Sequence, residues 1–236
     1  MYYSIFPTAT TYISSGSNKD TGESQIDQNF GGSEVLELKK VFSNSLFESQ
    51  TRILVKFDLN ETGNSISQSI VNGDIPSPTV VGLSAAKYYL KLYETEGNKE
   101  LSEEYTLAVL PLSESWQQGI GKSFDNPKTK EGCSWKYRSA ATNATSVSWT
   151  QGGAGVANGG SVVGVSGSTK SFDRTTSADL DIDVSNMVKS MLRGGMENHG
   201  MQIRFSGSQE TDNETFGHLK FFSRNTHTIF SPRLEV

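Results

Sequence analysis

Three aspartates that alternate along the chain have the types and spacing best suited to chemistry. Asp179, Asp181 and Asp183 are separated by Leu180 and Ile182, so on a β-strand their carboxylates would point to one side. Because calcium prefers oxygen ligands, Asp179 and Asp181 could share a structural calcium ion with loop carbonyl groups. No other cofactor has support in the sequence. The alternative, which we favour, is that the carboxylates face water on an edge strand and that Asp183 caps a helix.

Catalysis has no comparable support. The three histidines are scattered along the chain without the spacing of metal ligands: His199, His218 and His227. Cys133 is the single cysteine, which excludes an intrachain disulfide and a cysteine-rich zinc site. Glu103 and Glu104 would point to opposite faces of a strand, so they cannot flank one glycosidic bond. We therefore predict that the protein is not an enzyme.

Aromatic and basic side chains are the candidates for contact with a carbohydrate or a protein partner. They come from two regions of the chain: Lys87, Tyr89, Lys91, Tyr93, Trp116, Arg138 and Trp149. Tyrosine is also common on exposed strand positions because of its β-propensity alone. Among the three tryptophans, we expect Trp116 and Trp135 to be core or corner residues and Trp149 to be exposed.

Length and composition narrow the class of protein. The chain has 236 residues, of which 34% are hydrophobic, enough for a substantial core. All-β sandwiches of this length are commonly one domain, so we predict a single domain over residues 1–236. The formal net charge of -5 and the lack of a basic run argue against nucleic-acid binding. No stretch approaches the roughly 20 apolar residues of a membrane span, and the first residues do not resemble a signal peptide.

Alternating apolar residues predict β-strands along most of the chain. The clearest run, residues 52–59, places Ile53, Val55 and Phe57 on one face. The same pattern recurs in several shorter segments: residues 86–93, 105–112, 201–205, 219–222 and 233–236. We therefore predict an all-β protein, a single jelly-roll-like antiparallel β-sandwich with long loops.

One segment breaks this alternation and predicts a short helix near residues 185–193. Its apolar residues fall on one helical face: Met187, Val188, Met191 and Leu192. Ser185 or Asp183 can cap the first turn with a side-chain oxygen. Gly194 and Gly195 supply the left-handed exit that ends the helix.

Three polar stretches are predicted to lie outside the sandwich. Residues 14–30 read as a long loop, and insertions are expected at about 60–81 and 139–178, which are rich in turn-forming or small residues. The last of these has few apolar residues and is predicted to project from the body as a loop or flexible hairpin. Such loops suit packing against a neighbouring subunit.

The order of these pieces resembles the DNRLRE family, secreted β-sandwich modules that include disaggregatase-related and alginate-binding carbohydrate modules. The family shows a "DVT, helix, G, NYG, strand, F-x-S-R-E, P-x-L" series, and this chain has matching pieces in the same order: Asp183-Val184-Ser185, Gly194-Gly195, Asn198-His199-Gly200, Phe221-Phe222-Ser223-Arg224-Asn225 and Pro232-Arg233-Leu234. In the first half, residues 27–31 resemble the family's "N-x-N-Y/F-G" element, and residues 52–59 resemble its "R-x-L-L-x-F-D-L" strand. The resemblance implies a β-sandwich and, in some members, sugar binding.

Two departures from this family direct the functional prediction. Its members are normally exported and attached to other domains, whereas this chain begins almost at its first strand without a signal peptide. Assembly into a particle in the host cytoplasm would explain both departures. We therefore predict a non-enzymatic virion structural protein, a head, neck, tail or fibre component of a bacteriophage that contacts other virion subunits in a homo-oligomer or a hetero-assembly. The alternative is a carbohydrate-binding module that recognises a surface polysaccharide.

Overall fold

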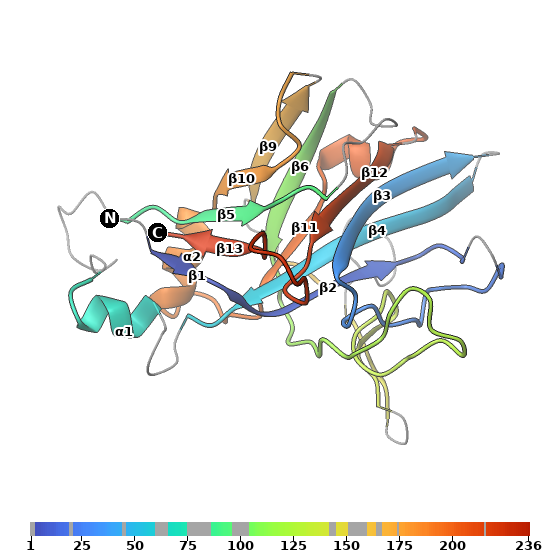
Figure 1. Ribbon diagram of the computed structural model, residues 1–236, viewed down its shortest axis with the longest axis horizontal. Coiled ribbons are helices and arrows are strands. Elements are labelled where there is room, and N and C mark those ends of the chain that lie inside the picture. The colour runs from blue at the N-terminus through green and yellow to red at the C-terminus, as the bar shows by residue number, and fades with distance from the viewer. Residues whose placement is uncertain are drawn as a thin grey trace.

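Two antiparallel β-sheets enclose the main hydrophobic core (Figure 1). The computed structural model describes residues 3–18, 21–43, 46–59, 66–74, 86–95, 104–141, 145–150, 160–163, 167–173, 175–214 and 216–236. The large sheet is seven-stranded, in the order β12-β3-β4-β11-β6-β9 with β2 paired to β4. The small sheet is four-stranded, in the order β1-β13-β5-β10. The predicted all-β sandwich is confirmed.

The bounds of the strands agree with the predicted alternation along most of the chain. The large sheet consists of β2 (Pro7–Ser14), β3 (Val35–Ser43), β4 (Leu46–Phe57), β6 (Glu104–Pro111), β9 (Ser168–Asp173), β11 (Met201–Phe205) and β12 (Phe216–Phe222). The small sheet consists of β1 (Ser4–Ile5), β5 (Tyr89–Leu92), β10 (Leu180–Asp183) and β13 (Arg233–Glu235). A separate hairpin pairs β7 (Tyr137–Ser139) with β8 (Val147–Ser148).

The main core is filled by the inward residues of both sheets. Ile53 and Val55 of β4 and Leu90 and Leu92 of β5 are fully buried in it. Each such side chain contributes about 1.5–3 kcal/mol when it leaves water. The core therefore depends on the alternation that the sequence displays.

The chain joins the two sheets at two corners. β1 pairs with β13 in the small sheet, and after Phe6 the chain continues as β2 in the large sheet. At a second corner the residues after β5 bond to β12, because Phe222 N–H donates to Tyr93 O (3.0 Å) and Thr95 N–H donates to Lys220 O (2.8 Å). These bonds pair residues at the β12 edge of the large sheet, which limits sheet-to-sheet aggregation.

Helix α2 (Ser185–Leu192) confirms the predicted short helix. Asp183 Oδ1 accepts a hydrogen bond from Ser185 N–H (2.8 Å), whereas Ser185 Oγ accepts one from Tyr88 N–H (2.9 Å). The N-cap position itself is occupied by Val184, which makes no side-chain capping bond, so the predicted cap by Ser185 or Asp183 is wrong and Asp183 bonds only the first helical N–H. Gly194 has φ 73°, the left-handed exit expected after the last turn.

A further helix, α1 (Ile66–Val71), was not predicted and lies in the insertion expected at about 60–81. The remainder of that insertion falls largely outside the described residues, which resume at 86 after 74. Within the part of the chain that the structure describes, each helix is too short or too polar to span a membrane.

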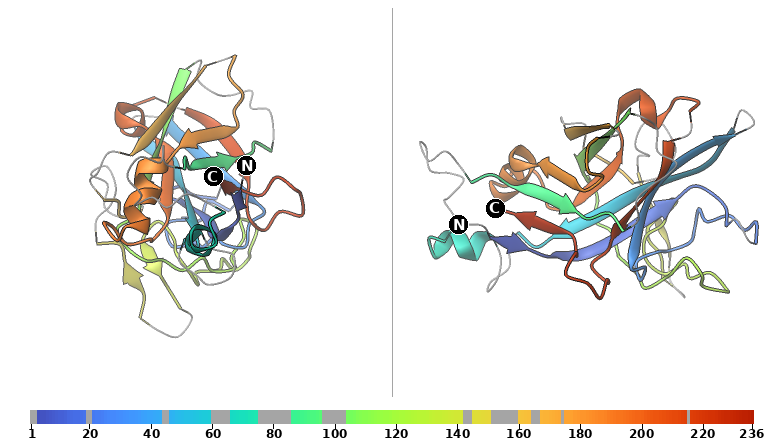
Figure 2. Two further views of the ribbon diagram at one scale, coloured as in Figure 1. Left: turned by 90° about the vertical axis from the view of Figure 1, so that its left-hand side faces the viewer. Right: turned by 45° about the horizontal axis from the view of Figure 1, so that its top comes forward.

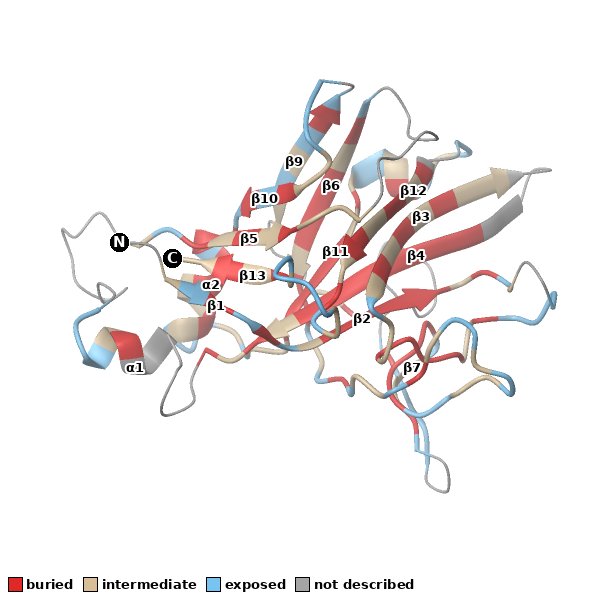
Figure 3. Cartoon of the chain, in the orientation of Figure 1, coloured by how far each residue is buried: buried red, intermediate tan, exposed pale blue. Residues whose placement is uncertain are grey.

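A second hydrophobic cluster lies on the opposite face of the large sheet. Ile13 and Leu54 belong to it, whereas their neighbours Tyr12 and Ile53 point into the main core. Residues 112–141 and 145–150, the loop layer, cover this face and bury five side chains there: Leu112, Trp116, Cys133, Trp135 and Trp149. Figure 3 shows the buried segments of the loop layer around β7. Both faces of the sheet are therefore dry at this point.

The prediction that Trp149 is exposed is wrong. Its side chain is only 4% exposed, and its Nε1–H donates to Ser134 O (3.0 Å). The residues around Trp149 in the sequence are polar, and they do not indicate that Trp149 packs on the apolar outer face of β2 and β4. The predicted burial of Trp116 and Trp135 is confirmed.

The insertion predicted at 139–178 does not project from the body of the protein along its whole length. Its residues 168–173 form β9, which pairs with β6 from Ser168↔Val109 to Asp173↔Glu104. Phe172 is the one buried residue of β9, so the alternation is too weak to read from the sequence. Residues 142–144, 151–159, 164–166 and 174 of this insertion lie outside the described residues.

A buried asparagine fastens the loop layer to the body of the protein. Asn29 is fully buried, and its Nδ2 donates to Gln118 O and Cys133 O, both at 2.7 Å. Its Oδ1 accepts from Gly31 N–H (3.0 Å) and Gly121 N–H (2.9 Å). A Cβ at Gly121 would lie 2.4 Å from Asn29 O, so a side chain there would separate the two segments. The amide group of Asn29 therefore holds two distant loops in contact.

We expect Asn29→Asp to lower the free energy of unfolding by at least about 3 kcal/mol, because both carbonyl groups lose their donor and meet a buried carboxylate instead. Urea denaturation measures this loss. Asn213→Asp is the matched control because Asn213 is exposed, and it should change the free energy little. A similar small effect for both variants would show that Asn29 does not hold the loop layer.

Candidate functional site

A cleft opens at a fork in the large sheet. β3 pairs with the start of β4, from Ser43↔Leu46 to Lys40↔Gln50, and β2 pairs with β4 from Ser14↔Thr51 onward. One edge of a strand accepts only one partner at each position, so β2 and β3 must separate near Thr51. The fork is therefore a direct consequence of the length of β4.

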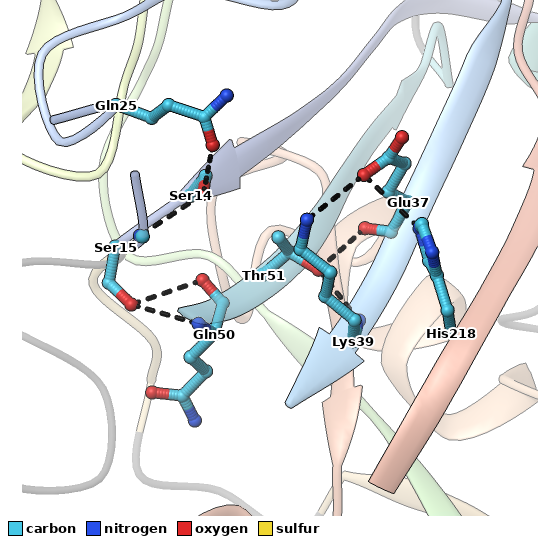
Figure 4. A network of polar contacts seen from close by, with 9 residues as sticks. Ser14, Ser15, Gln25, Glu37, Lys39, Gln50, Thr51 and His218 are labelled. Atoms are coloured by element: carbon cyan, nitrogen blue, oxygen red, sulfur yellow. Dashed lines mark hydrogen bonds and ion pairs between the residues drawn. The ribbon is translucent and has the colours of Figure 1, made fainter. Parts of the chain in front are cut away.

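Polar side chains complete the hydrogen bonding at the fork (Figure 4). Thr51 Oγ1 accepts from Lys39 N–H (2.7 Å) and donates to Glu37 O (2.8 Å). On the β2 side, Ser15 Oγ accepts from Gln50 N–H (3.0 Å). These hydroxyl groups take the place of ladder bonds that the departing strands no longer make.

The cleft at the fork has a volume of about 560 Å³. β3 and β12 line one side, and the loops at 17–28 and 123–128 line the other. Its lining includes amide, charged and aromatic side chains: Gln25, Gln28, Glu37, Lys39, Phe124 and His218. Phe124 is 77% exposed, so its ring faces solvent beside the polar groups.

Glu37 is the electrostatic centre of the cleft. Its Oε2 lies 3.2 Å from His218 Nε2 and 3.4 Å from Lys39 Nζ. Burial raises the pKa of Glu37, but hydrogen bonds and charge from His218 and Lys39 together outweigh it and hold that pKa below its usual value. Glu37 is therefore ionised at neutral pH and cannot act as a general acid there.

Tyr12 closes the inner end of the cleft. Its ring stacks on Phe30 with centroids 4.2 Å apart. Burial, reinforced by the charge of Glu37, raises the pKa of the Tyr12 phenol well above its usual value. Tyr12 thus stays neutral, and the cleft offers hydrogen-bond donors, acceptors and an aromatic face rather than an acid–base pair. Such a lining suits a polar ligand rich in hydroxyl groups.

The predicted contact residues near residue 90 lie on the small sheet, away from the cleft. Lys87 is exposed, and Lys91 Nζ pairs with Glu235 (2.8 Å) and Asp181 (3.4 Å). Tyr89, the partner of Glu235 in β13, is half-buried. The charge of Lys91 is therefore paired within the small sheet.

Tyr93 belongs to a small aromatic group. Its ring lies 5.5 Å from that of Phe230 and 5.1 Å from the guanidinium of Arg233. Phe230 in turn stacks near Phe222, with centroids 5.9 Å apart. Tyr93 thus supports the loop between β12 and β13.

The other predicted contact residues hold the loop layer in place. Trp116 Nε1–H donates to His199 O (2.8 Å), and Arg138 Nη1 donates to Ser115 O (3.0 Å). Trp149 is buried, as described above. The structure therefore separates the predicted set into two groups, and neither lines the cleft.

The three aspartates each have a protein partner. Asp179 Oδ1 accepts from Glu94 N–H (2.8 Å), Asp181 pairs with Lys91, and Asp183 bonds at the start of α2. Among the residues that the structure describes, no group of three or more His, Cys, Asp and Glu side chains is arranged to hold a metal ion. A calcium ion at Asp179 and Asp181 would compete with these bonds and stays a hypothesis.

Comparison with known proteins adds no relative. No family model matches the chain, and no curated protein has a significantly similar sequence. The resemblance to DNRLRE modules therefore stays a prediction that rests on the motifs given above.

The cleft was missed because its parts are far apart in sequence. Glu37 and Lys39 alternate with Leu36 and Leu38, which marks them as residues outside the main core, but His218 joins them only through the register of β12 with β3. That register includes an irregularity between Phe216 and His218, which period-two reasoning does not anticipate.

The lowered pKa of Glu37 gives a test by pH. The pKa of Glu37 is lower in the folded protein than its ordinary value of about 4.3. Ionised Glu37 therefore contributes stability above about pH 4.3, and this contribution is lost as the pH falls through the folded pKa. Glu37→Gln should therefore reduce the acid-induced fall in the free energy of unfolding by up to about 1 kcal/mol. Denaturation at several pH values measures it, with the exposed Glu131→Gln as control. An identical pH profile for Glu37→Gln and wild type would contradict the ion pairs.

Proposed function

We propose that the protein is a non-enzymatic structural component of a bacteriophage virion that acts as a subunit-interaction module. The observation that carries this proposal is a pair of hydrogen-bonded loops with large apolar side chains exposed to solvent. Ile120 (75% exposed) and Phe124 (77%) lie on the loop at 117–132, and Ile229 (84%) lies on the loop at 223–232. Single exposed apolar residues are ordinary, but apolar residues gathered on fixed loops are typical of a contact surface.

One backbone carbonyl group ties these two loops together. Gly31 O accepts from Gln118 Nε2 (2.5 Å) in the first loop and from Asn225 Nδ2 (2.9 Å) in the second. Arg224 Nη1 also donates to Gln118 Oε1 (3.2 Å). The loops therefore keep a fixed relation to each other, so a partner would meet surfaces that are already ordered.

A second candidate function is recognition of a surface polysaccharide, and the cleft at the fork is the observation that favours it. The amides of Gln25 and Gln28 and the charges of Glu37 and Lys39 can bond sugar hydroxyl groups, while the exposed ring of Phe124 can stack on a sugar face. A carbohydrate-binding role and a place in a virion are compatible.

The structural role predicts that the protein is found in purified phage particles by mass spectrometry. In the double variant Ile229→Ser and Phe230→Ser, we expect incorporation or self-association to weaken by at least about tenfold, because apolar side chains no longer leave water at the contact. His227→Ala is the matched control, since His227 is exposed on the same loop. Absence from particles, together with a monomer in sedimentation velocity, would contradict the structural role.

The polysaccharide role predicts binding on a glycan array that depends on the cleft. Phe124→Ala should weaken this binding by about tenfold, as expected for the loss of one stacking ring. Phe230→Ala removes an exposed ring outside the cleft and should leave the affinity unchanged. Equal losses in both variants, or no glycan bound by the wild type, would exclude the cleft as a sugar site.

A further inference from the structure

A buried lysine meets an aspartate where the connection between β11 and β12 packs on β3. Lys40 is fully buried, and its Nζ donates to Gln209 O (2.6 Å) and contacts Asp212 Oδ1. Asp212 is 30% exposed. The ammonium and carboxylate groups are therefore in direct contact, with the ammonium shielded from water and the carboxylate partly exposed.

A buried glutamic acid follows the carbonyl group that Lys40 contacts. Glu210 ends the short 3₁₀ helix η2 (Gly207–Glu210), and its Oε1 lies 2.7 Å from both Arg52 Nε and Arg52 Nη2. Glu210 O accepts from Gln50 Nε2 (3.1 Å), and Gln50 is the register partner of Lys40. These contacts hold the turn after η2, which carries Asp212, against β3 and β4.

We propose that Lys40 Nζ and Asp212 Cγ become joined by an intramolecular isopeptide bond. The bond would link β3 to the connection between β11 and β12, segments that are far apart in sequence. A chain with a single cysteine has no disulfide to serve as such a link.

The reaction is a condensation that needs no other reagent. Lys40 Nζ passes one proton to Asp212 Oδ1, which it contacts, and the resulting amine attacks Asp212 Cγ. The new C–N bond forms, one C–O bond breaks, and a second proton moves from the nitrogen to the leaving oxygen. The three ammonium protons are accounted for by one amide hydrogen and the two hydrogens of the released water.

Burial of Lys40 favours the product. A buried ammonium carries a large desolvation cost, whereas the amide that replaces the ion pair is neutral.

Intact mass spectrometry of the purified full chain tests the bond. The folded wild type should be lighter than its sequence mass by one water molecule, and proteolysis should release a branched peptide that contains Lys40 and Asp212. A wild-type chain at its full sequence mass overturns the proposal, and Lys40 and Asp212 are then an ion pair only.

Variants separate the bond from other losses of water. Lys40→Arg should restore the full mass, because a guanidinium does not acylate in this way, whereas Asp212→Asn should lose one ammonia in place of water. Lys39→Arg is the matched control: Lys39 pairs with Glu37, so this variant should still lose water. A loss of water that persists in Lys40→Arg would assign it to another residue and contradict the bond.

Discussion

The amide of Asn29 is the interaction on which the rest of the structure depends. It satisfies two carbonyl groups and two amide groups that would otherwise be buried without partners. Only a side chain with both donors and an acceptor can do this, and aspartate, the isosteric alternative, has no donor when ionised. With the loop layer held there, Trp135 and Trp149 cover the outer face of β2 and β4, and the loop that carries Phe124 has a fixed position at the cleft.

The length of β4 is the second constraint, and it produces the cleft. Because β4 extends beyond β3, its free edge must be taken up by another strand, and β2 fills it from Thr51 onward. The hydroxyl groups of Thr51 and Ser15 bond the backbone where the ladders part. The cleft opens beside β3 where the ladders part, and Glu37 and Lys39 belong to its lining.

The sequence predicted those parts of the fold that a local pattern encodes. The alternation around Ile53 and the helical spacing around Val188 each describe an element whose buried face is set within a few residues. Trp149 and β9 were missed because their environment is set from a distance: Trp149 by an apolar outer sheet face, and β9 by pairing with β6. The cleft was missed for the same reason, since His218 reaches Glu37 only through strand register.

Under the proposed structural role, polar attachment of the two loops would allow their exposed apolar side chains to meet a partner in an arrangement that is already ordered. A flexible loop with Ile229 exposed would lose conformational entropy on binding, and in solution it could collapse onto other apolar surface. The bonds of Asn225 and Gln118 to Gly31 remove much of that freedom when the chain folds. The entropic cost of ordering these loops is thus met when the chain folds and not when a partner would bind.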